Sequence, residues 1–246
     1  MNSIRLVAGF LVASLTAAAQ AGPPYLTDDP SPTEPGHWEI YAFGAGEHSR
    51  ASESEELDAE GGLDLNYGAM EAVQLSATLP LSLSHAAFNG WRSGTGDLEL
   101  AVKYRFVNEE QRHLSAAIFP RAILPTSSLE RHERAKLLLP LWVEKDFPGN
   151  ISIFGGGGYE FNPGAGHRDF WQAAMAVTHD FDQRISLGGE IAWQQPDTAG
   201  GSNQLRAGFG SIIKLSHHHA LLFSAGPTWM NHQTGYHFYA ALGLDL

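Results

Sequence analysis

The sequence contains no cysteine, so disulfides cannot hold the fold, and no lipid can be attached to an N-terminal cysteine. Beyond residue 21 there is also no apolar run of the ~20 residues that a membrane-spanning helix needs. Basic residues are scarce, at 15 against 27 acidic ones, and the net charge of −12 at pH 7 argues against nucleic-acid binding. Glycine, with 27 residues, and the aromatic residues are abundant instead, which favours short strands and tight turns over helices.

The first 21 residues have the organisation of a cleavable secretory signal peptide. Arg5 supplies the basic region, residues 6–18 are apolar, and residues 19–21 (Ala-Gln-Ala) form a small-x-small cleavage site. The sequence therefore predicts export and a mature chain that starts at Gly22. A short uncleaved anchor is the alternative, although the apolar stretch falls short of spanning length.

Residues 22–36 contain five prolines and predict an extended leader without regular structure. At ~3.1 Å per residue such a segment is long enough to cross the interior of a small barrel. Asp28 and Asp29 would then belong to a plug. The alternative is a loose periplasmic tail.

Residues 96–106 show the pattern that governs the rest of the chain. Leu98, Leu100, Val102, Tyr104 and Phe106 share one parity, and four of the five residues between them are charged. Successive side chains of a strand point to opposite faces, so this strand has one apolar and one polar face. Similar alternation predicts strands at residues 37–46, 61–68, 72–84, 96–106, 113–124, 136–145, 150–162, 169–181, 184–193, 204–215, 219–229 and 236–246.

The connections between these strands alternate in length. Short turns are predicted at 69–71, 108–112, 146–149, 182–183 and 216–218, and longer loops at 47–60, 85–95, 125–135, 163–168, 194–203 and 230–235. This alternation indicates an all-β fold, an up-and-down antiparallel transmembrane β-barrel of about 12 strands, over residues 37–246. An even number of strands can close and leave no unpaired edge in lipid. A secreted soluble β-sandwich or lipocalin-like cup is the alternative.

Such a barrel implies the outer membrane of a Gram-negative bacterium, with membrane lipids, lipopolysaccharide and the barrel-assembly machinery as partners. Its aromatic residues near the rims predict interfacial girdles. They are Trp38, Tyr67, Tyr104, Phe106, Tyr159, Trp171, Trp193, Trp229 and Tyr236.

The inward parity of the predicted strands carries eight acidic and seven basic residues. We expect a polar, nearly neutral lumen, in which charges must be paired or hydrated. One interpretation is a pore lining that selects and orients a small solute. The other is a closed structural barrel that these charges fill as a salt-bridge lattice. The residues are Glu39, Asp64, Asp97, Glu99, Lys103, Arg105, Arg121, Lys136, Glu144, Glu160, Asp180, Arg184, Glu190, Arg206 and Lys214.

Three further features have weaker functional interpretations. The acidic residues of the 47–60 loop fit a solvated loop, or one that binds lipopolysaccharide through divalent cations; they are Glu47, Glu53, Glu55, Glu56, Asp58 and Glu60. His217–His219 alternate in direction on a strand and so make a poor metal site. Gly155–Gly158 has no following helix, so a phosphate loop is not supported; the small residues let the wall bend or let a bulky side chain lie close.

An outer-membrane lipid hydrolase is the competing class of function. Ser84, His85 and His113 are candidates for its catalytic residues, but their spacing assembles no triad and G-x-S-x-G is absent. The sequence therefore predicts a passive transporter without catalytic residues, cofactor or metal.

Several motifs resemble a group of outer-membrane proteins described as transporters and related to the "meta-pathway of phenol degradation" family. They are the segments Pro23–Pro30, His37–Glu39, Leu63–Gly68, Gly96–Phe106, Leu139–Trp142 and Gly155–Tyr159. The resemblance covers most of the mature chain. It implies a small barrel that passes small hydrophobic or aromatic compounds.

Overall fold

The structure is a computed structural model that describes residues 24–51, 54–86, 90–129 and 134–246. The predicted signal peptide lies outside the described residues. Among them, no helix is long and apolar enough to cross a membrane. The strands are β1 (Trp38–Ala51), β2 (Ser54–Met70), β3 (Val73–Ala86), β4 (Gly90–Thr95), β5 (Leu98–Glu109), β6 (Leu114–Ile118), β7 (Arg121–Leu124), β8 (Lys136–Phe147), β9 (Ile151–Phe161), β10 (Phe170–Asp180), β11 (Ile185–Gln194), β12 (Gln204–Lys214), β13 (His219–Met230) and β14 (Gln233–Asp245).

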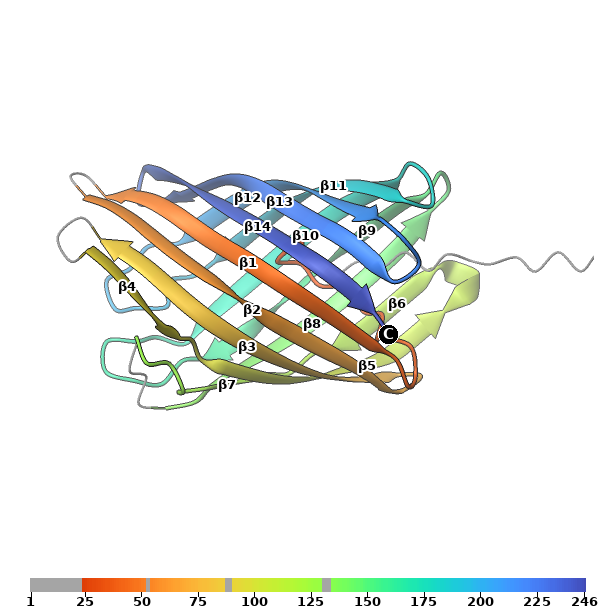
Figure 1. Cartoon of the computed structure of the whole chain (residues 1–246), viewed down its shortest axis with the longest axis horizontal. Helices are drawn as coiled ribbons and strands as arrows, with labels where there is room; N and C mark the ends of the chain where they lie inside the picture. The colour runs from red at the N-terminus through yellow and green to blue at the C-terminus, as the bar shows by residue number, and fades with distance from the viewer. Residues whose placement is uncertain (1–23, 52–53, 87–89, 130–133) are drawn as a thin grey trace, which may run out of the picture.

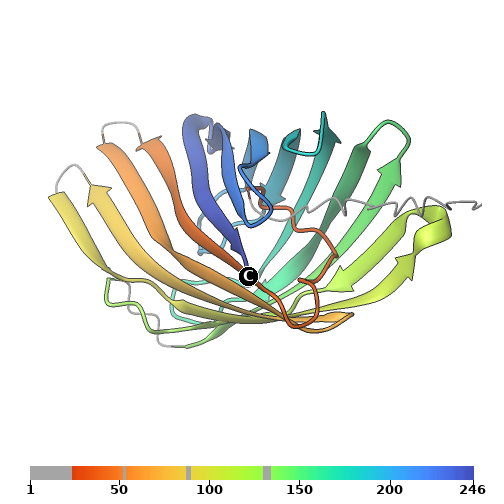
Figure 2. The same cartoon turned by 45° about the vertical axis from the view of Figure 1, so that its right-hand side comes forward.

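These segments form a closed antiparallel barrel of twelve strands (Figures 1 and 2). β4 and β5 both pair with β3, and β6 and β7 both pair with β5 and β8, so each of these two couples is one strand with a short break. The last strand, β14, pairs with β1 from Glu39 opposite Asp245 to His48 opposite Tyr236. The predicted fold class and strand number are therefore confirmed.

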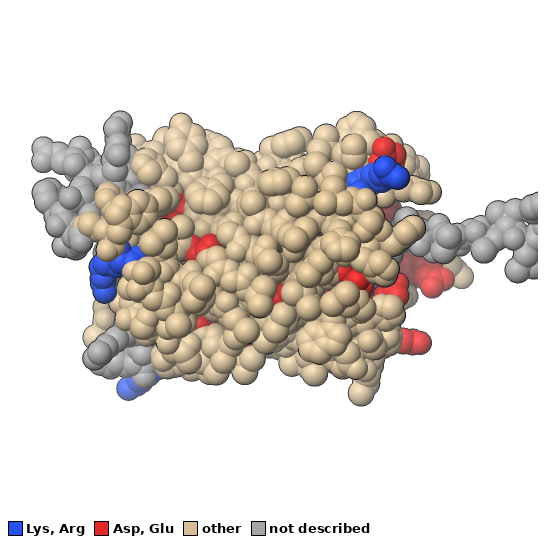
Figure 3. Space-filling model, in the orientation of Figure 1, with Lys and Arg blue, Asp and Glu red and all other residues tan. Residues whose placement is uncertain are grey.

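The outer surface carries the predicted apolar rows. On β3, Leu75, Leu79, Leu81 and Leu83 are all exposed, and their neighbours of opposite parity line the interior. In Figure 3 the visible Lys and Arg atoms lie toward the two ends of the barrel, and the band between them is largely uncharged. In the described part of the chain these rows pack against no second sheet, which contradicts the β-sandwich alternative. They have the exposure expected of a surface that faces lipid.

The two ends of the barrel differ. Trp38 N donates to Leu246 O at 2.8 Å, so the first and last strands meet at the end that also holds the short turns. We call this the short-turn end; its turns are residues 71–72, 110–113, 148–150, 181–184 and 215–218. We call the other the long-loop end; the described residues 125–129, 134–135, 162–169 and 195–203 lie in its connections.

Three predicted loops at the long-loop end are wrong. β1 continues to Ala51 and β2 begins at Ser54, so most of 47–60 is a strand hairpin. Most of 85–95 likewise belongs to β3 and β4. β13 and β14 are joined by Asn231 and His232 alone, both with positive φ, so 230–235 holds a two-residue turn. Strands that extend past the lipid need no apolar outer row, so the alternation that marks them in the sequence is lost.

The four glycines 155–158 lie within β9. A Cβ on Gly156 would fall 2.9 Å from Cε3 of Trp142 and 1.9 Å from the carbonyl oxygen of Leu141. Trp142, on the inner face of β8, is buried together with Phe119 and Ala101. The missing side chain at Gly156 therefore leaves the space in which Trp142 lies against the wall.

Candidate functional site

The leader, residues 24–36 in the described chain, runs from the short-turn end into the barrel (Figure 2). Near its end Gly36 N donates to Gly68 O of β2 at 2.7 Å. At its other end Pro24 O accepts a hydrogen bond from Ser224 Oγ of β13 at 2.6 Å. Between these points the leader contacts β3, β5, β7, β9, β11 and β12, which lie around most of the wall. It therefore crosses the lumen.

Near the short-turn end, Thr33 of the leader is held by Gln74 of β3. Its Oε1 accepts from Thr33 N at 2.8 Å and from Thr33 Oγ1 at 3.1 Å. Its Nε2 donates to Asn66 Oδ1 and Ser76 Oγ on the inner wall. Thr33, Gln74 and Asn66 are buried, so the network satisfies polar groups that water does not reach.

Asp28 joins the leader to two basic residues of the wall. Its Oδ1 lies 2.9 Å from Lys103 Nζ, and its Oδ2 lies 2.9 Å from Arg121 Nη2. The side chains of Asp28 and Lys103 are 12% and 5% exposed, so these ion pairs are weakly screened by solvent. Each carboxylate oxygen thus accepts a charge-assisted hydrogen bond from a different strand.

The wall holds the two cations in place. Phe119 is buried beneath both, with Lys103 Nζ 4.9 Å and Arg121 Cζ 4.3 Å from the ring centroid. Arg121 Nη1 also lies 3.3 Å from Glu99 Oε1 of β5. Arg121 Nε is buried and has no hydrogen-bond partner.

A second carboxylate, Glu190 of β11, binds the leader from the opposite side. It accepts hydrogen bonds from the backbone amides of Leu26 and Thr27 and from Thr27 Oγ1. Thr27 is fully buried, whereas the Leu26 side chain is half exposed to the cavity. Two of the three hydrogen bonds by which Glu190 holds the leader therefore come from the leader's backbone.

Tyr25 occupies a slot in the wall. Its ring meets Phe154 edge to face, with centroids 6.1 Å apart. A Cβ on Gly188 would lie 2.5 Å from Tyr25 Oη, and one on Gly210 would lie 2.6 Å from Cε1. The slot exists because β11 and β12 carry no side chain at these two positions.

Asp29, the second acidic residue of the leader, is 3% exposed. Burial is the main cause that raises the pKa of its carboxyl to about 7, with Lys103 opposing the rise and Asp28 adding to it. Asp29 Oδ1 accepts from Ser31 N at 2.6 Å. This hydrogen bond shapes the turn that follows Asp28.

A cavity of about 1440 Å³ remains beside the leader, with wall residues from both ends of the barrel around it. Eleven of the fifteen residues predicted from inward parity line it, as do Asp28 and Asp29. The eleven are Glu39, Asp64, Asp97, Glu99, Lys103, Arg121, Lys136, Arg184, Glu190, Arg206 and Lys214.

The other four predicted residues lie apart from this cavity. Arg105 donates to Glu71 O at the short-turn end, and Asp180 is the last residue of β10 there. Glu144 and Glu160 are buried. Glu144 Oε1 is buried without a hydrogen-bond partner.

The described ion pairs do not fill the lumen as a lattice. Arg121–Glu99 joins two members of the predicted set, Arg206 pairs with Glu47, and the other described ion pairs of Lys103 and Arg121 are with Asp28 of the leader. The open volume beside them favours the pore interpretation over the closed lattice.

Sequence reasoning missed four residues of the site: Tyr25, Gln74, Phe119 and Trp142. Gln74 has the inward parity but carries no charge, so it was left out of the predicted lining. Phe119 and Trp142 are apolar residues that point inward, against the expected pattern. Pro120 marks the break between β6 and β7 and is the one signal beside Phe119 that the strand is irregular there.

The remaining predicted features do not assemble into sites. Ser84 lines the cavity near the long-loop end, and the adjacent His85, of opposite parity, contacts Trp91 with the rings tilted by 48°. His113 lies in a turn at the short-turn end, so the three hydrolase candidates do not meet. His218 Nδ1 bonds to Asp245 O, and His219 Nδ1 to Ser216 Oγ. Within the described ranges no group of three or more His, Cys, Asp or Glu residues is placed to hold a metal ion.

The acidic segment 47–60 faces the lumen in part. Glu47, Asp58 and Glu60 line the cavity, so for these three a loop surface that binds lipopolysaccharide is wrong. Glu53 and the side chains of Glu55 and Glu56 lie outside the described part.

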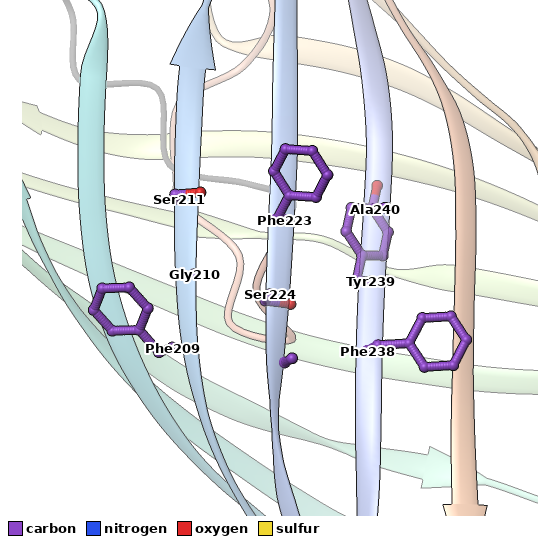
Figure 4. Close-up of a pocket in the computed structure, with 9 residues that line it drawn as sticks. Phe209, Gly210, Ser211, Phe223, Ser224, Phe238, Tyr239 and Ala240 are labelled. Carbon is purple, nitrogen blue, oxygen red and sulfur yellow. The ribbon is translucent and has the colours of Figure 1, made fainter.

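A shallow depression of about 370 Å³ lies on β12, β13 and β14 (Figure 4). Phe209, Phe223 and Phe238 surround it and are exposed, and Ala225 and Ala240 form part of its lining. It is apolar, as expected of a surface against acyl chains.

Comparison with solved structures places the fold among outer-membrane barrels. The crystal structure of the COG4313 outer membrane channel from Pseudomonas putida F1 matches with a TM-score of 0.72 at 12% identity, over 89% of this chain and 98% of that one. The NanC porin matches with a TM-score of 0.56 at 8% identity, over 83% and 100%. The CymD monoaromatic hydrocarbon channel matches with a TM-score of 0.52 at 7% identity, over 86% and 88%.

No protein-family model matches the sequence, and a search of curated proteins finds no relative. At these identities the structural matches show the fold alone. The resemblance to the phenol meta-pathway group therefore stays a prediction.

Proposed function

We propose that the protein is an outer-membrane channel for small solutes, and that residues 24–36 act as an internal plug that must move for solute to pass. The single observation that carries the proposal is the pairing of Asp28 with both Lys103 and Arg121 beside an open lumen. A purely structural barrel has no need to hold an extended leader across a hydrated cavity.

The contacts of the leader suit a reversible plug. They are hydrogen bonds, two ion pairs and one aromatic slot, and in the described chain the leader contains no strand or helix. The cavity beside it leaves room for solvent next to Asp28 and Glu190, and water can replace such hydrogen bonds at little enthalpic cost when the leader moves. The similarity in fold to proteins described as channels and porins agrees with this role.

The proposal is tested by osmotic swelling of proteoliposomes that contain the mature protein or a variant without residues 22–36. Small neutral and charged solutes should enter faster through the shortened protein than through the intact one. Folding of both proteins is checked by their heat-modifiable migration. No swelling with either folded protein would contradict the channel and favour the closed structural barrel.

A further inference from the structure

Lys103 and Arg121 form a cationic pair whose partner in the closed barrel is a carboxylate of the leader. Both oxygens of Asp28 are used, one by each cation, at 2.9 Å. A free carboxylate presents the same two oxygens in the same plane. The site is therefore one to which a dissolved carboxylate can bind in the manner of Asp28.

The wall forms this site without help from the leader. Lys103 and Arg121 both lie over the ring of Phe119, which is 5% exposed and belongs to the buried cluster of the inner wall. Arg121 is also held by Glu99. The two cations thus keep their separation when the leader withdraws.

Withdrawal leaves the pair short of acceptors. The described hydrogen bonds of Lys103 Nζ go to Asp28 Oδ1 and Ser31 O, both of the leader. Arg121 loses its bond to Asp28 and already carries a buried Nε without a partner. Lys103 then has no ion-pair partner among the described residues and Arg121 keeps only Glu99, so the open barrel favours an anion at this position.

The site also opens onto the solute path. Asp28, Lys103, Phe119 and Arg121 all line the large cavity, and the Arg121 side chain is 25% exposed. A solute in the lumen therefore reaches the pair without crossing the wall.

We infer that the Lys103–Arg121 pair is a binding site for small carboxylate solutes, and that such a solute opens the channel by taking the place of Asp28. The inference rests on the proposed function, because the solute must enter the lumen. It adds the chemical class of the solute and a reason for the leader to carry an aspartate at this position.

The test uses the full mature chain with Pro30→Cys as a probe. The sequence has no other cysteine, and Pro30 is fully buried, so a neutral maleimide should modify the introduced thiol only when the leader is displaced. Leu26→Cys, already half exposed in the docked leader, reports on reagent access alone.

Sodium benzoate is compared with benzamide, sodium chloride and sodium phosphate at equal ionic strength. Benzoate at saturating concentration should raise the labelling rate of Pro30→Cys about tenfold, since it takes over the charge-assisted contacts that Asp28 makes with Lys103 and Arg121. Benzamide, chloride and phosphate should leave the rate unchanged. An equal effect of benzamide or phosphate would overturn the carboxylate assignment.

Variants of the pair locate the effect. Each change is made in the Pro30→Cys protein. Lys103→Met should raise its labelling rate and abolish the response to benzoate, whereas Lys103→Arg should keep the response. Lys145→Met changes a lysine outside the predicted lumen set and should respond as the parent does. A full response in Lys103→Met would overturn the site.

The two proposals fail in different ways. If benzoate speeds labelling but the protein never conducts or swells liposomes, the channel proposal fails and the carboxylate site stands. If removal of the leader opens the barrel and benzoate has no effect on labelling, the carboxylate inference alone fails.

Discussion

The ring of Tyr25 lies over Gly210, where a Cβ would fall 2.6 Å from Cε1 of the ring. The leader's only aromatic residue thus depends on an absent side chain in β12. This contact can be removed without changing any charge in the lumen, which separates steric docking of the leader from its ion pairs.

Gly210→Ala should displace Tyr25 and loosen the leader. Overpacking of a fitted site costs about 1–3 kcal/mol, or roughly 5- to 150-fold in the labelling rate of Pro30→Cys. Gly44→Ala is the matched control, because nothing lies within 4 Å of its Cβ position. Equal labelling of the two variants would mean that Tyr25 does not anchor the leader.

Asp28→Asn and Lys103→Met should each weaken docking by about 2 kcal/mol, the range of a hydrogen bond between charged groups. Because both changes break the Asp28–Lys103 contact, the double variant should cost less than the sum of the two single effects. The labelling rate of Pro30→Cys is measured in the parent, the two single variants and the double variant, which together form a double-mutant cycle. Additive effects would show that the two side chains act independently.

The docking of the leader should depend on pH through Asp29. The pKa of its carboxyl is raised to about 7 when docked, and it returns to its lower ordinary value when released. Docking thus binds a proton: it is strongest in acid, weakens as pH rises toward about 7, and levels off above that. The charged groups that face Asp29 are Lys103, Asp28, Glu39 and Glu144.

This dependence is measured as the labelling rate of Pro30→Cys between pH 5 and pH 8, corrected for maleimide reactivity with Leu26→Cys. Asp29→Asn should remove most of it, since the amide does not titrate. An unchanged pH profile in Asp29→Asn would assign the titration to another group.

Leu79→Arg should impair insertion into a bilayer. Leu79 is exposed near the middle of β3, and arginine on the lipid face of a barrel costs about 2–4 kcal/mol at the membrane midplane. Thr78→Arg, next in sequence and facing the lumen, is the control. Urea titration of refolding into vesicles should separate the two, and equal midpoints would contradict the assignment of the faces.

The sequence predicted the barrel because lipid and lumen impose opposite chemistry on alternate residues. That constraint acts only within the membrane. Strand ends beyond it, such as 47–51 and 54–60, lose the pattern and were assigned to a loop. The turn at Asn231–His232 was missed because it adopts positive φ without a glycine.

The candidate site was predicted in its charges but not in its arrangement. Inward parity found Lys103 and Arg121, and the proline-rich composition indicated that the leader was extended. Parity gives the face of a residue and not its neighbours, so the pairing of Asp28 with both cations could not be derived. The inward-pointing Phe119 was missed because its strand is interrupted at Pro120.

Single-channel conductance in planar bilayers tests the internal plug most directly. The mature protein is compared with the full-length Tyr25→Ala/Asp28→Asn double variant and with the protein that lacks residues 22–36. The account predicts that the intact protein is mostly closed and that both altered proteins show larger or more frequent discrete steps. Equal conductance in all three folded proteins would contradict the plug, and silence in all three would contradict the channel.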